Sequence, residues 1–433
     1  MAEEKVQMRK QLGLLEGVAI ILGIIFGSGI FISPKEVLEK NWFCLGCFDS
    51  VGSVWCTCNS WCYVLCRIRP STNAIMSVTF ANNLLEPIFP NCPIDPLCQK
   101  LIAAVTICLL TFINAYDVKF TTRIQNVFMF TKIAALFIII LGGIAWMCQG
   151  KLEHFEDGWA GTKTSVSDWS VAFYSGIFSY SGWNYLNFMT EELRDPFVNL
   201  PRAIYISLPL VTGIYLLANI SYFAVLGPVG VRATEAIAVD FAVVALGWLK
   251  WAMPTLVAIA ILGGLSVHIM TSSRMCFAGA RNGHMPELLA HINVKCMSPM
   301  PSLVFLMLIS LIMLIPSNLT SLITYCTVVE SFFTLLSCSA VLWLRYKRPE
   351  LVRPIKVSLW MPIIFVAVLL VLMIVPVVSE PVAVIAGALI TLAGVPVYFV
   401  LVRGQPKYLA NVSVKFTHAC QKLFLTAVED KDE

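Results

Sequence analysis

The sequence predicts an all-α protein that crosses a membrane many times. Hydrophobic residues make up 58% of the 433 residues and charged residues only 13%, and the mean hydropathy is +0.79. Apolar runs of about 20 residues, the length that crosses a bilayer as a helix, recur from end to end. We therefore expect one transmembrane domain over residues 12–402, a cytoplasmic N-terminus over 1–11 and a cytoplasmic C-terminal tail over 403–433.

Eleven membrane segments can be identified in order along the chain. The first runs from Leu12 to Leu38 and is interrupted at Gly27–Gly29. The others are Arg69–Leu85, Leu97–Ala115, Ile124–Met147, Trp169–Met189, Ala203–Leu226, Trp248–Thr271, Ser302–Pro316, Leu319–Leu344, Leu359–Val378 and Val382–Val402.

Basic residues orient these segments by the positive-inside rule. Lys and Arg gather before the first segment, in alternate connections, and after the last one. One such connection holds Arg274, Arg281 and Lys295, which we expect in the cytoplasm. Both termini are then cytoplasmic, and the number of crossings must be even.

The missing crossing falls in a degenerate, Cys-rich segment over residues 41–68. A short crossing at about Trp42–Ser60 would bring the total to twelve, with the next segment starting near Trp61. The six cysteines of this segment lack a standard zinc spacing and have no histidine nearby, so we expect no metal site and no cofactor. A net charge of only +4 gives no reason to expect a nucleic-acid partner.

Two of the segments are interrupted by residues that favour leaving the helix. Gly27, Ser28 and Gly29 interrupt the first, and the run from Ser179 to Asn184 interrupts the fifth. Backbone groups freed inside a bilayer need protein, water or ligand as partners, and paired interruptions are typical of the midplane site of a secondary transporter. The alternative is helix packing through small residues.

Several stretches resemble a known family, the light subunits of the heteromeric amino acid transporters. They include GIIFGSGIFISPKEVL (23–38), FSYSGWNYLNFMTEELRDPFVNLPRAI (178–204) and TSSRMCFAGARNGHMPELLAHINV (271–294). The resemblance extends to the L-type family of the amino acid–polyamine–organocation superfamily. It implies a five-plus-five inverted-repeat fold with two C-terminal helices. It also implies sodium-independent exchange of L-amino acids, most simply neutral ones, at the plasma membrane.

The sequence departs from this family after Glu39. A full second helix and the inner half of the third are expected there, and the Cys-rich segment stands in their place. We therefore expect helix 2 and the first half of helix 3 to be abnormal or missing. One alternative follows directly, namely a variant that cannot transport but still binds the partner subunit. A membrane-embedded enzyme is disfavoured, because no catalytic constellation accompanies the histidines.

The two interruptions supply most of the candidate substrate-binding residues. Freed N–H groups in the first would bind the substrate carboxylate, and freed carbonyls in the second would bind its ammonium group. The residues are Ile24, Ile25, Gly27, Ser28 and Gly29 in the first, and Phe178, Ser179, Ser181, Gly182, Trp183 and Asn184 in the second. The resemblance makes Phe178 an aromatic gate, whereas residue type alone favours an ordinary core aromatic.

Three ionisable residues within membrane segments are further candidates. Lys132 either extends to the cytoplasmic face or, as the resemblance implies, its ammonium replaces the sodium ion of sodium-coupled relatives. Glu330 lies mid-span, where an uncompensated carboxylate is costly, and would attract cationic substrates. Arg69 could pair with Glu330 and cancel its charge, which we favour and which leaves a site for neutral substrates.

Cys92 is the candidate for a disulfide to a partner. It lies in PNCPIDP, in a connection poor in basic residues and therefore expected outside. The resemblance implies that this cysteine links the chain to a single-span glycoprotein heavy chain. A free or locally paired thiol is the alternative, and Cys98 is close enough to compete.

Overall fold

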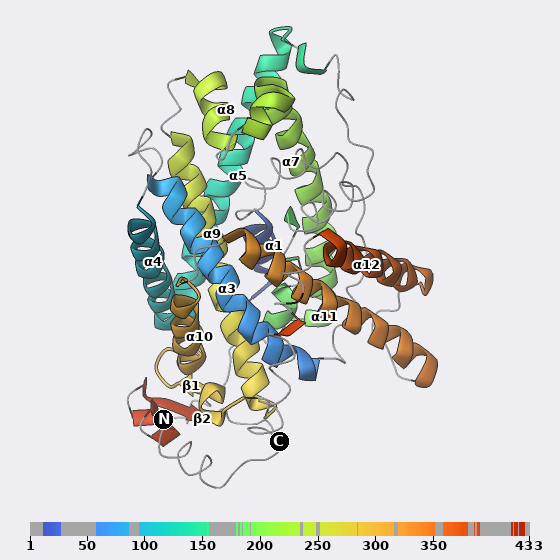
Figure 1. Cartoon of the computed structure of the whole chain (residues 1–433). Helices are drawn as coiled ribbons and strands as arrows, with labels where there is room; N and C mark the ends of the chain where they lie inside the picture. Colours follow the sequence, from blue (N-terminus) through green and yellow to red (C-terminus); the bar gives the residue numbers. More distant parts are fainter. Residues whose placement is uncertain are drawn as a thin grey trace.

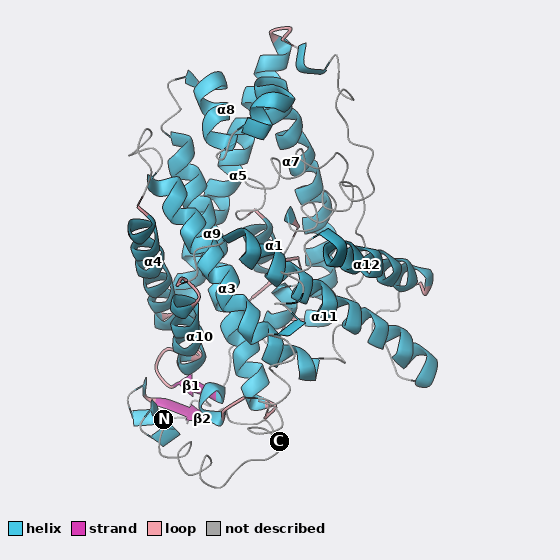
Figure 2. Cartoon of the chain, in the orientation of Figure 1, coloured by secondary structure: helices cyan, strands magenta, loops and turns pink. Residues whose placement is uncertain are grey.

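The computed structural model describes residues 12–26, 58–85, 95–151, 153–155, 179–180, 182–183, 185–190, 192–233, 237–247, 252–283, 285–315, 319–350, 358–379, 385, 388–389, 417–418, 420–422 and 424–428. Within these ranges the chain is almost entirely helical, and Figure 2 shows two short strands at one end of the helix bundle. The predicted all-α class is therefore confirmed for the described part of the chain.

The helices follow one another along the chain as shown in Figure 1. They are α1 (Leu14–Ile25), α3 (Cys58–Leu85), α4 (Pro96–Tyr116), α5 (Val118–Cys148), α7 (Pro196–Ala233), α8 (Ile237–Ala245), α9 (Ala252–Arg281), α10 (Met300–Ile312), α11 (Leu319–Lys347) and α12 (Trp360–Ser379). Among the described residues, three short stretches of 3-10 helix accompany them: η2 (Glu153–Phe155), η3 (Tyr185–Met189) and η5 (Glu287–Ala290). The strands are β1 (His291–Asn293) and β2 (Thr426–Val428).

Most predicted membrane segments coincide with helices. The agreement is close for α4, α11 and α12. In α7 the helical backbone is interrupted at Gly227, where φ is 65° and ψ is 172°, so its first part ends at Leu226 as predicted. By length and hydropathy, four of the described helices could span a membrane: Pro96–Tyr116, Arg123–Cys148, Pro196–Val231 and Ala252–Arg281.

The largest differences from the prediction concern three helices. α3 begins at Cys58, within the segment predicted to be degenerate, and its 28 residues are long enough to cross a bilayer. α9 continues to Arg281, ten residues beyond the predicted end at Thr271. α8 was not predicted, because nine residues are too few to cross a bilayer. All of residues 41–57 and most of the predicted segment 382–402 lie outside the described residues.

The core of the bundle is built around α9. Most of its side chains are buried, including polar ones such as Ser266, Ser272 and Ser273. Glycines allow neighbouring helices to approach closely, as is common in membrane proteins. A Cβ on Gly263 of α9 would lie 2.6 Å from the Cβ of Phe128 on α5, and a Cβ on Gly143 of α5 would overlap Ser221 of α7.

Apolar side chains cover the outer faces of the bundle. On α4 they recur about every four residues, which places them along one side of the helix. They are Leu97, Leu101, Val105, Leu109 and Phe112, each more than half exposed. An apolar outer surface is what lipid tails require, so the periphery of the bundle fits a membrane protein.

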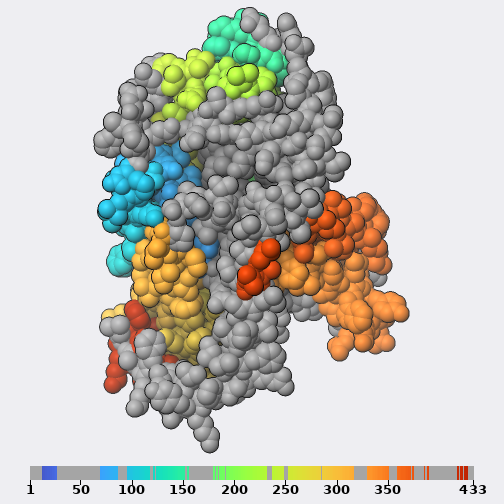
Figure 3. All heavy atoms as spheres, in the orientation of Figure 1, coloured from blue at the N-terminus to red at the C-terminus, as the bar shows by residue number. Residues whose placement is uncertain are grey.

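Two features lie at the edges of the bundle. Figures 1 and 3 show α11 and α12 side by side, leaning out from one side of the molecule. At the end of the bundle near α10, β1 pairs antiparallel with β2, with Ile292 opposite Ala427. Asn293 Nδ2 also donates to the Phe424 carbonyl at 2.6 Å, so part of the predicted tail is fastened to the connection between α9 and α10.

Candidate functional site

The first interrupted segment leaves its helix where the sequence predicts. α1 ends at Ile25, and Phe26 has φ −73° and ψ 36°, outside the helical region. The last carbonyls of a helix have no partner within the helix, and the helix dipole makes them favourable for cations and donors. Two side chains from other helices donate to them, Lys132 to Gly23 and Tyr215 to Ile25.

The second interrupted segment also departs from α-helix. From Tyr180 to Thr190 the described residues form turns and the 3-10 helix η3. Gly182 has a φ of +104°, which side-chain-bearing residues rarely adopt. The interruption predicted from SYSGWN is therefore present in the described part of this stretch.

Tyr215 of α7 joins the two interrupted segments, and the sequence did not single it out. Its hydroxyl lies 2.6 Å from the Ile25 carbonyl and 3.3 Å from the Ser179 carbonyl. Its ring contacts Phe26 and Tyr180, with centroid distances of 5.7 and 5.4 Å. A single buried phenol thus holds the ends of both interruptions at one place, and it occupies one of the carbonyls predicted to bind a substrate ammonium.

A second contact between the segments is made by Gly182 and Ile24. A Cβ on Gly182 would overlap the Ile24 side chain, so any other residue at this position would require a shift of Ile24 or of the turn. Trp183, the next residue, packs against the main apolar core. The predicted binding residues Ile24, Ile25, Ser179, Gly182 and Trp183 therefore come together around one junction.

Lys132 lies beside this junction on α5. Its side chain is only 1% exposed, and its ammonium group donates to the carbonyl of Gly23, two residues before the end of α1. Gly263 of α9 leaves room for it, since a Cβ there would lie 3.0 Å from Lys132 Cε. The side chain therefore points into the bundle rather than extending to the cytoplasmic face.

Arg69 and Glu330 do not form the predicted ion pair among the described residues. Arg69 is buried, and its Nη1 donates to Ser272 Oγ at 3.2 Å. Its guanidinium lies over the rings of Tyr185 and Phe188, at 4.3 and 4.5 Å from their centroids. Glu330 of α11 lies within electrostatic reach of Arg69. Aromatic faces hold the guanidinium instead, a favourable arrangement for a desolvated cation.

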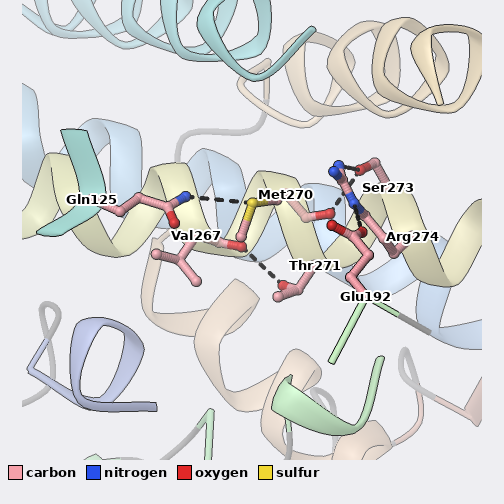
Figure 4. Close-up of polar contacts among 7 residues, drawn as sticks. All are labelled: Gln125, Glu192, Val267, Met270, Thr271, Ser273 and Arg274. Carbon is pink, nitrogen blue, oxygen red and sulfur yellow. Dashed lines mark hydrogen bonds and ion pairs between the residues drawn. The ribbon is translucent and has the colours of Figure 1, made fainter. Parts of the chain in front are cut away.

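Arg274 does not lie in a connection between helices, where the sequence predicts it. Arg274 belongs to α9, is 4% exposed, and its Nε lies 2.7 Å from Glu192 Oε1 (Figure 4). A buried arginine needs a charged partner, and Glu192 supplies it from the end of the second interrupted segment. The pattern of basic residues placed Arg274 in a loop because it did not show that α9 continues past Thr271.

The start of α1 is tied to the same place. The Leu12 N–H donates to the Glu192 carbonyl at 3.0 Å, and the Arg194 N–H donates to the Leu12 carbonyl at 2.8 Å. The two interrupted segments are thus joined beside Glu192 as well as at Tyr215. Figure 4 shows further polar side chains around α9, including Gln125, whose Nε2 lies 3.6 Å from Met270 Sδ.

Seven predicted site residues lie outside the described residues. They are Gly27, Ser28, Gly29, Cys92, Phe178, Ser181 and Asn184. Their roles remain predictions. No group of three His, Cys, Asp or Glu residues in the described ranges could hold a metal ion.

An apolar helix bundle with two interrupted segments held together at its buried core is typical of membrane transporters. The amino acid permease family matches residues 39–402. The large neutral amino acids transporter small subunit 2 of Mus musculus is 38% identical over 458 residues, covering 96% of this chain and 86% of that protein. The Asc-type amino acid transporter 1 of Homo sapiens is 35% identical over 474 residues, covering 100% and 90%. The b(0,+)-type amino acid transporter 1 of Mus musculus is 34% identical over 461 residues, covering 98% and 94%.

The chain belongs to the amino acid permease family, among the light subunits of the heteromeric amino acid transporters. This confirms the resemblance seen in the sequence, and the family is one of transporters rather than enzymes. The aligned length of 458 residues exceeds the 433 residues of the chain. The alignment therefore contains positions for which this chain has no residue.

Proposed function

We propose that the chain is the transporting subunit of a sodium-independent exchanger of neutral L-amino acids in the plasma membrane. Alternating access would carry the substrate through a five-plus-five inverted-repeat fold with both termini in the cytoplasm. The observation that carries the proposal is the junction of the two interrupted segments at Tyr215, since Ile25 and Ser179 come from parts of the chain far apart in sequence. Paired interruptions are where secondary transporters bind their substrates.

The junction suits the two charged ends of an amino acid. Freed carbonyl oxygens of the second interrupted segment would attract an ammonium group, and the freed N–H groups expected at Gly27–Gly29 would attract a carboxylate. Lys132 supports transport without sodium coupling. Its ammonium group donates to the Gly23 carbonyl, and in this role it would replace a bound sodium ion. Transport would then need no sodium ion to complete this part of the site.

A heavy chain is the proposed partner. The relatives named above include a small subunit, and light subunits of this family act with a single-span glycoprotein. Cys92 is the proposed site of the disulfide, on the outer, oxidising side of the membrane. Cys98, at the start of α4, is exposed and unpaired among the described residues, so it is the competing thiol.

Replacing Cys92 by serine is expected to remove a reducible high-molecular-weight band on non-reducing gels when both chains are expressed. Cys98→Ser is the matched control, because it removes an exposed thiol six residues away and should leave the band. Persistence of the band in Cys92→Ser and its loss in Cys98→Ser would assign the bridge to Cys98 instead.

Neutral substrates are favoured because the buried guanidinium of Arg69, which lies over Tyr185 and Phe188 of the second interrupted segment, would repel a cationic side chain there. The alternative is an exchanger that also accepts cationic amino acids, with Glu330 facing the substrate side chain. Of the three relatives, one is named for large neutral amino acids.

Exchange of labelled leucine in choline medium, competed by arginine, tests the proposal and its alternative together. We expect leucine exchange to be unchanged when choline replaces sodium, and we expect arginine to compete weakly in both the wild type and Glu330→Asn. Strong competition by arginine that disappears in Glu330→Asn would establish the cationic alternative. Leucine exchange that requires sodium would contradict the proposal itself.

A subunit that binds the heavy chain without transporting is the second candidate. It is suggested by the Cys-rich segment over 41–68, where the sequence predicts that helix 2 and the first half of helix 3 are abnormal or missing. Glycosylation acceptor sites placed after Glu39 and after Ser60 report whether this segment crosses the membrane. Two crossings and normal amounts at the cell surface would argue against this candidate.

A further inference from the structure

A chain of buried polar side chains runs across the bundle behind the junction. His268 of α9 is 1% exposed. Its Nδ1 lies 2.6 Å from Asn73 Oδ1 of α3, and its Nε2 lies 3.1 Å from the Tyr185 hydroxyl of η3. Asn73 Nδ2 continues the chain to Ser310 Oγ of α10 at 3.1 Å. Four elements that are distant in sequence are therefore connected through His268.

In this network, the donor and acceptor of each hydrogen bond follow from the adjacent hydrogen bond. Ser310 has one O–H, which donates to the Leu306 carbonyl at 2.7 Å, so its oxygen accepts from Asn73 Nδ2. The amide oxygen of Asn73 then faces His268 and accepts from Nδ1–H. Nε2 is left as the acceptor of a neutral imidazole, and it receives the Tyr185 O–H.

Tyr185 transmits this arrangement to the interrupted segment. Its side chain bonds to His268, and its backbone N–H donates to the Gly182 carbonyl at 3.1 Å. Gly182 is the residue that lies against Ile24. The ring of Tyr185 also contacts the His268 ring, at 5.2 Å between centroids, and the Arg69 guanidinium, at 4.3 Å from its centroid.

We propose that His268 and Asn73 are positioning residues of the amino acid site: through the Tyr185 hydroxyl they hold the turn at Gly182 in place against α1. This inference deepens the proposed function and rests on it. Neither residue needs to touch the substrate. Their effect on transport passes through Tyr185, because Tyr185 is the residue that bonds both to the buried network and to the turn.

Two replacements of His268 separate its two hydrogen bonds. Asparagine places its amide near the position of Nδ1, so His268→Asn keeps a partner for Asn73 and loses Tyr185. Glutamine reaches the position of Nε2, so His268→Gln keeps a partner for Tyr185 and loses Asn73. A purely structural role predicts similar defects for both variants, whereas positioning of Tyr185 predicts a difference between them.

The experiment measures the KM and maximal rate of leucine exchange for the complex with its heavy chain, normalised to protein at the cell surface. We expect Tyr185→Phe and His268→Asn each to raise KM about fivefold, the factor associated with one buried hydrogen bond, and His268→Gln to leave KM within about twofold. Adding Tyr185→Phe to His268→Asn should raise KM no further. Tyr222→Phe is the control, because Tyr222 is equally buried and its hydroxyl has no partner among the described residues.

Independent, multiplied effects of Tyr185→Phe and His268→Asn would overturn the inference, as would equal defects in His268→Asn and His268→Gln. The thermal unfolding midpoints of the purified complexes allow the single variants Tyr185→Phe and His268→Asn to be compared with the double variant without a transport assay. If the wild type exchanges no leucine, the proposed function fails. Additive changes in midpoint for Tyr185→Phe and His268→Asn would then still refute the coupling of these two residues, and non-additive changes would support it.

Discussion

Replacing Gly182 by alanine is expected to reduce leucine exchange at least about tenfold, which corresponds to about 1.4 kcal/mol. Two effects contribute. At φ +104° a residue with a Cβ is strained by about 1–3 kcal/mol, and this Cβ would overlap Ile24. Relief of the overlap requires Ile24 or the turn to shift, which disturbs the contact between the two interrupted segments. The measurement is exchange of labelled leucine per molecule at the cell surface.

Gly213→Ala is the matched control for Gly182→Ala. Gly213 lies within α7, and a Cβ there would meet no other atom within 4 Å. Alanine is the better helix former, so this variant should retain exchange and surface level. Equal exchange in Gly182→Ala and Gly213→Ala would contradict the close contact between the two segments.

Replacing Lys132 by methionine is expected to have the second large effect. Methionine keeps much of the apolar bulk but removes the donor to the Gly23 carbonyl. A buried carbonyl that loses its partner costs about 1–3 kcal/mol, and the end of α1 loses the positive charge that its dipole favours. We expect exchange to fall at least about tenfold, while the surface level falls much less.

Lys151→Met distinguishes this effect from the general loss of a lysine. Lys151 lies just beyond α5, where it is exposed and its ammonium group contacts the ring of Trp146, so exchange should be preserved. Parallel losses of exchange and surface level in Lys132→Met would indicate that Lys132 serves folding rather than transport. Sodium-dependent exchange in the wild type would also contradict the role proposed for its ammonium group.

Helix positions were predicted well from the sequence because hydropathy directly reports burial in lipid. The ends of α1 and of the first part of α7 coincide with the predicted positions, since glycine at 27 and 227 marks both. The sequence predicted that the two interruptions would lie close together, but not that Gly182 would contact Ile24. Interruptions that face each other are a general property of transporters, whereas the residues that touch depend on tertiary packing.

The polar groups inside the bundle could not be predicted in the same way. Tyr215 lies in an apolar run where its hydroxyl gives no distinct signal, and its two carbonyl partners are freed only by the interruptions. His268 was dismissed because no other histidine accompanies it, yet its partners are Asn73 and Tyr185. Arg274 was placed in a loop because its charge outweighed the helical pattern, and its partner Glu192 lies 82 residues away.

Counter-transport by the purified complex of the chain and its heavy chain in proteoliposomes tests the central claim most directly. Vesicles are loaded with unlabelled leucine or left empty, and uptake of labelled leucine is followed in choline medium. The account predicts rapid uptake into loaded vesicles, little into empty ones, no change with sodium, and no rapid uptake in Gly182→Ala. Equal uptake with and without internal leucine, or none by an assembled wild-type complex, would contradict the claim that the joined interruptions form an amino acid exchange site.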